Sequence, residues 1–132
     1  MQDAARSFFR SAIETPSPSG FEEPIQSLIR DYITPFADNV RSDVHGNLVA
    51  SVGDLSGPKL MYAGHCDQIG MLISHIDELG FLYAQTIGGW DPQQLIGQAM
   101  TIWTAQGPVA AVISRKPIHL LNDQERKQVV QL

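Results

Sequence analysis

The sequence predicts an α/β protein in two parts, a layered α/β region followed by a β-rich region. Three observations support this fold class. Apolar residues recur at helical spacing near the N-terminus, a nearly all-apolar run precedes residue 67, and short β-rich runs follow it at intervals of about ten residues. The strand pattern changes near residues 67–70, so we place the two regions at 1–67 and 68–132.

Two helices are expected before residue 35. Asp3 can cap the first, which must end before the TPSPSG loop at 15–20, since prolines and glycine interrupt a helix. Ser19 or Gly20 is expected to begin the second helix, and Thr34-Pro35 to end it. Its apolar stripe consists of Phe21, Ile25, Leu28, Ile29, Tyr32 and Ile33.

Strands are expected from residue 38 onward. DNVRSDV and NLVASVG are strand-like runs joined by a turn at His45-Gly46-Asn47. After a second turn, the apolar run KLMYAGH at 59–65 predicts a short strand covered on both faces, as in the sheet of an α/β protein.

The region after residue 67 carries several short β-rich runs broken by glycine and proline: IGMLISHI, GFLYAQTI, AMTIWTA and GPVAAVISR. Such spacing is typical of a small β-barrel or sandwich. A hairpin is expected around Gln106-Gly107, and the tail NDQERKQVVQL is expected to be helical, capped by Asn122 or Asp123.

Composition excludes several classes of protein. The chain is 43% hydrophobic and 17% charged with a net charge of −5, which fits a folded globular protein. Its scattered basic residues argue against nucleic acid as a partner. No apolar stretch reaches the roughly 18–20 residues that span a membrane. Cys66 is the only cysteine, so no intrachain disulfide can form, and a cytoplasmic location is expected.

His65 and Asp67 form the one pattern that suggests chemistry. Side chains two residues apart on a strand point to the same side. The His65 imidazole and the Asp67 carboxylate would therefore lie on the same face of the predicted strand. A metal-ligating histidine usually donates its second ring N–H to a carboxylate. His-x-Asp is nevertheless common, and His45, His75 and His119 do not complete a site by spacing. From the residues alone, a metal site and ordinary polar packing both remain open.

Several stretches together resemble the N-terminal part of one enzyme family. They are TPSPSGFEEPI at 15–25, DVHGNLVA at 43–50, AGHCDQIGMLISHI at 63–76, GFLYAQTIGGWDPQQLIGQAMTI at 80–102 and KPIHLLNDQERK at 116–127. In this order they are similar to the dinuclear metallo-aminopeptidases of the glutamyl, deblocking and tetrahedral type. The resemblance implies that 1–67 opens a zinc-peptidase α/β domain and that 68–132 begins an inserted β-rich dimerisation domain.

The resemblance also implies roles for two residues. His65 matches the family's first metal ligand, and Asp67 matches the catalytic-site carboxylate that orients it. Gln68 departs from the family, which usually has glutamate there. The complete enzyme would use two divalent metal ions, zinc or cobalt, to remove N-terminal residues from peptide substrates, and a dimer-based homo-oligomer is expected.

In the family, the other metal ligands and the general base lie further along the sequence than the position that matches Leu132. We therefore expect a truncated chain that is inactive alone and that does not hold metal unaided. A non-enzymatic assembly or regulatory module derived from the family is the alternative. Metal-independent folding and a specific complex with a full-length relative would favour that alternative.

Overall fold

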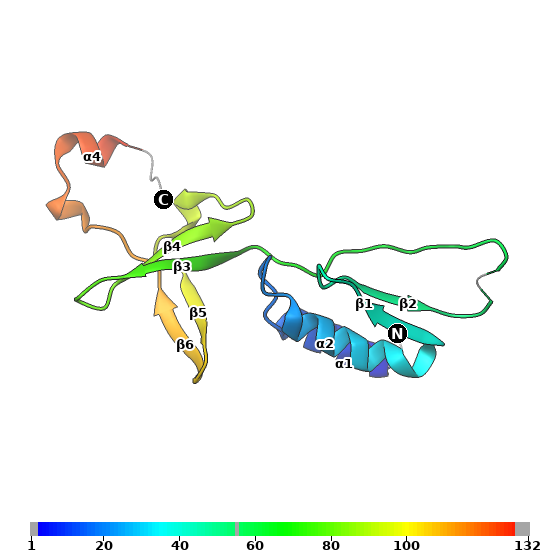
Figure 1. Cartoon of the computed structure of the whole chain (residues 1–132). Coiled ribbons are helices and arrows are strands. Elements are labelled where there is room, and N and C mark those ends of the chain that lie inside the picture. The colour runs from blue at the N-terminus through cyan, green and yellow to red at the C-terminus, as the bar shows by residue number, and fades with distance from the viewer. Residues whose placement is uncertain (1–2, 55, 129–132) are drawn as a thin grey trace. The chain divides into compact units, whose positions relative to one another are not determined.

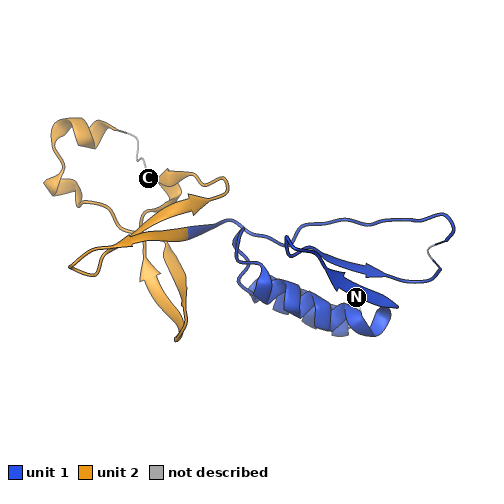
Figure 2. Cartoon of the chain, viewed as in Figure 1, with its two compact units in different colours: residues 1–71 blue, residues 72–132 orange. Residues whose placement is uncertain are grey.

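The computed structural model describes residues 3–54 and 56–128. It is a mixed α/β chain with two compact units, residues 1–71 and 72–132 (Figure 2). Within the described residues no helix is both long and apolar enough to cross a membrane.

The first unit begins with two helices, α1 (Asp3–Glu14) and α2 (Glu23–Ile33), and a 3₁₀ turn, η1 (Thr34–Phe36), follows α2 directly (Figure 1). The helices contact one another through aromatic rings, with the centroids of Phe8 and Tyr32 only 3.8 Å apart. Ile25 is buried, with 3% of its surface exposed. The predicted helices and their endpoints near 14 and 34 are confirmed.

The predicted start of the second helix was wrong. Gly20 has a φ of +92°, and the N–H of Phe21 donates to the carbonyl of Pro18 in a tight turn. This turn keeps Ser19 and Gly20 out of the helix, which begins at Glu23 with Pro24 in its first turn.

A two-stranded antiparallel sheet follows, formed by β1 (Asn39–Ser42) and β2 (Leu48–Ser51). The predicted turn between them is confirmed. The Asp43 carboxylate closes it by accepting hydrogen bonds from the backbone N–H groups of His45 and Asn47, at 2.9 and 3.0 Å. The Arg30 guanidinium donates to Ser42 and ties α2 to this sheet.

The predicted strand at 59–65 is not present. Residues 58–67 have no regular secondary structure, and Leu60, Met61 and Tyr62 are more than three-quarters exposed, at 80%, 84% and 88%. A strand exists only where a neighbouring backbone pairs with it, and no described segment pairs with this one. Its apolar side chains therefore lie uncovered.

The four predicted β-rich runs are present as strands. The first, β3 (Gly70–Ile76), begins at the end of the first unit and continues into the second. The second unit also contains β4 (Leu82–Ile87), β5 (Ala99–Thr104) and β6 (Gly107–Val112). β3 pairs with β4, and β5 pairs antiparallel with β6 around the predicted turn at Gln106-Gly107. The strands β3 to β6 thus form two separate two-stranded sheets, and no closed barrel is present among these described strands.

Short helical segments fill the remainder of this unit: α3 (Pro92–Leu95), η2 (Ile118–Leu120) and α4 (Asp123–Lys127). Leu95 and Leu121 are its buried apolar side chains, with 1% and 8% of their surfaces exposed. The predicted tail helix is confirmed only over α4. Gln128 is extended, and 129–132 lie outside the described residues.

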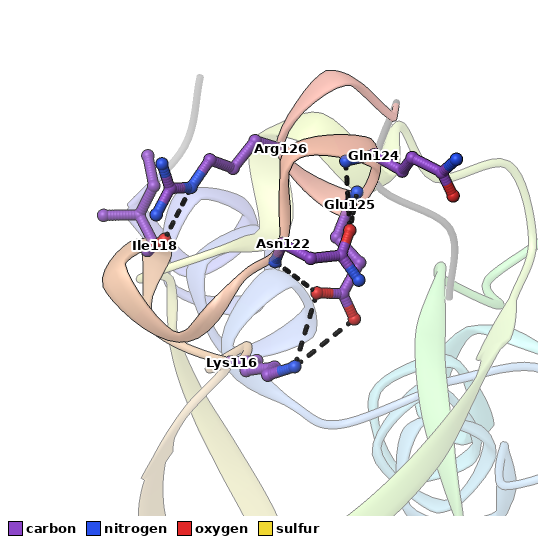
Figure 3. Close-up of polar contacts among 6 residues, drawn as sticks. All are labelled: Lys116, Ile118, Asn122, Gln124, Glu125 and Arg126. Carbon is purple, nitrogen blue, oxygen red and sulfur yellow. Dashed lines mark hydrogen bonds and ion pairs between the residues drawn. The ribbon is translucent and has the colours of Figure 1, made fainter.

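A reciprocal cap fixes the start of α4 (Figure 3). The Asn122 side chain accepts hydrogen bonds from the backbone N–H groups of Gln124 and Glu125, at 3.0 and 2.8 Å. In return, the Glu125 carboxylate accepts one from the Asn122 N–H at 2.7 Å and pairs with the Lys116 ammonium at 3.3 Å. Asn122 is thus the cap, one of the two residues predicted for that position.

Candidate functional site

His65 and Asp67 lie in contact at the end of the uncovered segment. The Nδ1 atom of His65 is 2.9 Å from Oδ1 of Asp67. An ionised carboxylate can only accept, so a neutral imidazole that makes this contact carries its proton on Nδ1 and its lone pair on Nε2. The His65 side chain is 86% exposed, so Nε2 is accessible to a ligand.

The second oxygen of Asp67 accepts a hydrogen bond from another part of the chain. The Ser19 hydroxyl donates to Oδ2 of Asp67 at 2.6 Å, across a separation of 48 residues. This hydrogen bond is the main reason that the pKa of Asp67 is lowered from its ordinary value, and the His65 contact adds to the effect. The carboxylate therefore stays ionised and accepts from both sides.

Backbone hydrogen bonds bring Ser19 to this position. The N–H of Gln68 donates to the carbonyl of Ser17 at 2.7 Å, and the N–H of Ser19 donates to the carbonyl of Gln68 at 3.2 Å. Together they form a short parallel bridge between Pro18 and Gln68. Sequence reasoning missed Ser19, because the TPSPSG loop carries no spacing signal that relates it to residue 67.

An open cleft of about 620 Å³ lies in front of His65. The start of α2 lines it, together with the turn at 44–47 and the segment 64–67. His45 and Glu22 also face this cleft. Among the described residues, however, no group of three or more histidine, cysteine, aspartate or glutamate side chains could hold a metal ion.

The donor set therefore fits part of a metal site. An accessible Nε2 on a histidine held through Nδ1 by a carboxylate is the form in which imidazole binds zinc-like ions. A catalytic zinc ion takes about three protein ligands. The described residues bring one imidazole and one carboxylate together in this arrangement and do not complete such a set. His75 lies in the second unit, where its ring contacts Tyr83 with centroids 5.7 Å apart.

Cys66 lies between the two site residues but faces α2. Its sulfur accepts a hydrogen bond from the Gln26 amide at 3.4 Å, and the side chain is half-buried. Burial raises the pKa of the Cys66 thiol, and the nearby Asp67 and Glu22 carboxylates raise it further. A protonated thiol is a poor nucleophile, so the surroundings of Cys66 favour a packing role for this side chain over a nucleophilic one.

Comparison with known proteins gives a consistent set of relatives. Residues 46–132 match the family model described as M42 glutamyl aminopeptidase. The chain is 38% identical over 112 residues to lysyl aminopeptidase of Pyrococcus furiosus, an alignment that covers 84% of this chain and 32% of that protein. The chain thus spans about a third of the length of this curated relative.

Solved structures match over nearly the whole chain. A TET aminopeptidase from a marine sediment Thaumarchaeota archaeon superposes with a TM-score of 0.92 at 34% identity, covering 98% of this chain and 36% of its own. The TET1 peptidase of Pyrococcus horikoshii, which can assemble into a tetrahedron or a large octahedral shell, gives a TM-score of 0.80 at 30% identity. That match covers 96% of this chain and 37% of the other.

Proposed function

Since the chain belongs to the M42 glutamyl aminopeptidase family, we propose that it supplies the first metal ligand of a metal-dependent aminopeptidase. The complete protein would remove N-terminal residues from peptides. The observation that carries this proposal is the placement of His65, whose Nδ1 atom contacts Asp67 while its exposed side chain lines an open cleft.

In this proposal each residue has one task. His65 would hold a zinc or cobalt ion through Nε2, and Asp67 would keep the proton of the imidazole on Nδ1. When bound, two such ions supply Lewis acidity and lower the pKa of a water molecule. In this proposal the remaining ligands and the general base would lie outside the described residues.

Substitution of His65 tests the assignment in the protein as its own gene encodes it. The intact mass is measured first, followed by metal content and the release of N-terminal residues from peptides with zinc or cobalt present. His65→Ala should remove most of the activity and lower the metal content. His75→Ala, in the second unit, is the matched control and should change neither. Unchanged turnover and metal content in His65→Ala would refute the ligand role.

The β-rich region, residues 68–132, is proposed as part of an inserted dimerisation domain. The assembly of the Pyrococcus horikoshii relative into a tetrahedron or a large octahedral shell supports a homo-oligomer, which we propose is built from dimers. The mass of the native complex, measured by analytical ultracentrifugation, tests this proposal. The lone cysteine supports a cytoplasmic location.

One observation favours a second candidate function, an assembly or regulatory module without catalysis. The described residues hold no complete set of metal ligands. A native mass near 14.5 kDa with no peptide hydrolysis, and a specific complex with a full-length relative, would favour the module. Metal-dependent release of N-terminal residues would exclude it.

A further inference from the structure

We infer that Ser19 is a positioning residue for the metal ligand His65 and acts through Asp67. The inference rests on the proposed function. The two oxygens of Asp67 have separate partners, the Ser19 hydroxyl at 2.6 Å and the His65 Nδ1 atom at 2.9 Å. Fixing one oxygen restricts rotation of the carboxylate, so the other oxygen points in one direction only. The orientation of the imidazole, and therefore of Nε2, follows from that direction.

The Ser19 backbone is held without help from its hydroxyl. The Ser19 N–H donates to the carbonyl of Gln68, and the N–H of Gln68 donates to the carbonyl of Ser17. Removing the hydroxyl should therefore leave the loop in place. Any effect of such a change would arise at the Asp67 carboxylate.

Close packing keeps this bridge at a short distance. A Cβ atom added at Gly70 would lie 2.6 Å from Cβ of Pro18, so only glycine allows the two segments to approach this closely. Ser17 is completely buried next to the contact. The turn that follows, with Gly20 at a φ of +92°, directs the chain away toward α2. Ser19 is thus delivered beside Asp67 by a constrained loop.

The contribution of these hydrogen bonds to folding is small. The side chains of His65 and Asp67 are 86% and 39% exposed, and polar contacts between exposed groups stabilise a fold only weakly. Ser19 is exposed as well, so the same argument applies to its hydroxyl. The main effect of these hydrogen bonds is to orient the Asp67 carboxylate and, through it, the His65 imidazole.

The test compares three variants of the complete protein with one another and with His65→Ala. Ser19→Ala removes the hydroxyl, and Ser19→Thr keeps it. Ser56→Ala is the matched control, since the Ser56 hydroxyl also donates to a carboxylate, that of Asp54, at 2.7 Å. Two quantities are measured: zinc affinity, by competition with a chelator, and the ¹⁵N chemical shifts of the His65 ring in the metal-free protein. These shifts report which nitrogen carries the proton.

Ser19→Ala should lower zinc affinity by about threefold to tenfold, less than the 10–100-fold typical when the direct partner of a ligand is lost. Its ring shifts should indicate a mixture of tautomers. Ser19→Thr should stay within about twofold of the unaltered protein because the hydroxyl remains. Ser56→Ala should match the unaltered protein.

Two results would overturn the inference, and only the second would also overturn the proposed function. If His65→Ala releases zinc while Ser19→Ala changes neither affinity nor ring shifts, the role of Ser19 is wrong and the ligand assignment stands. If His65→Ala also leaves zinc affinity unchanged, the proposed function fails with it. Circular dichroism of each variant confirms that the fold is retained.

Discussion

Phe8 of α1 and Tyr32 of α2 stack with their ring centroids 3.8 Å apart and their planes inclined by 11°. Tyr32 also contacts Phe36 in the turn after α2, at a centroid distance of 5.8 Å. These rings join the two helices of a unit in which Ile25 is the only described apolar side chain that is buried. The helix pair therefore depends on an aromatic contact more than on a deep core.

Phe8→Ala should consequently lower the free energy of unfolding by about 1–3 kcal/mol, less than the loss of a fully buried phenylalanine. Urea denaturation of the complete protein measures this quantity. Phe9→Ala, the neighbouring position with 58% of its surface exposed, is the control and should cost less than about 1 kcal/mol. Equal effects of the two substitutions would show that the stacked pair is not what holds α1 to α2.

Gly70→Ala should disturb the bridge that carries Ser19. The added Cβ would meet Pro18 at 2.6 Å, so the loop or the strand must shift, at a cost of about 1–3 kcal/mol. Zinc affinity should fall in the same variant. Gly57→Ala is the control, because nothing lies within 4 Å of the added atom and its φ is not positive. It should be neutral or stabilise by up to about 1 kcal/mol.

The cap of α4 should weaken in acid. Hydrogen bonding by the Asn122 N–H, aided by the Lys116 ammonium, lowers the pKa of Glu125 from its ordinary value of 4.5. A group with a lowered folded-state pKa stabilises the fold above its ordinary pKa, and the stabilisation is lost as the pH falls through the folded value. The amide chemical shift of Asn122 should therefore change in that acidic range, and α4 should fray.

Glu125→Gln should remove this pH dependence and leave the Asn122 side-chain cap in place. Asp123→Asn changes a carboxylate in the same helix that is 93% exposed, and it should leave the Asn122 transition intact. A transition that survives Glu125→Gln would have to come from another group.

Cys66 should react slowly with iodoacetamide at neutral pH. Burial and two carboxylates raise the pKa of its thiol, so less thiolate is present than for an unhindered cysteine. We expect alkylation about tenfold slower in the folded protein than in denaturant. Mass spectrometry of timed samples measures both rates, and equal rates would show that the thiol is neither shielded nor shifted.

Local patterns predicted the local elements well. Helical spacing located α1 and α2, and turn residues located the bends at 43–47 and at Gln106-Gly107, where Gly107 has a φ of +119°. In each case the hydrogen bonds that define the element lie within a few residues of one another. Sequence spacing therefore contains the information needed.

The strand predicted at 59–65 failed for the opposite reason. Its apolar composition predicted coverage on both faces, yet coverage and pairing depend on other segments that spacing cannot report. The residues of the site also differ in whether local spacing could predict them. His65 and Asp67 are two residues apart and were predicted to lie together. Ser19 reaches Asp67 only through a tertiary contact across 48 residues.

Among the described residues, regular backbone hydrogen bonding holds the chain after His65 but not the segment before it. After Asp67 the chain is bridged to Ser17 and Ser19, while the described residues at 58–66 that precede it have no regular structure. The pattern of replacements among relatives should therefore differ between these two parts of the chain. Among relatives, replacements at Pro18 or Gly70 should appear as matched pairs that preserve their close approach. Replacements within 59–62 should vary independently of both positions.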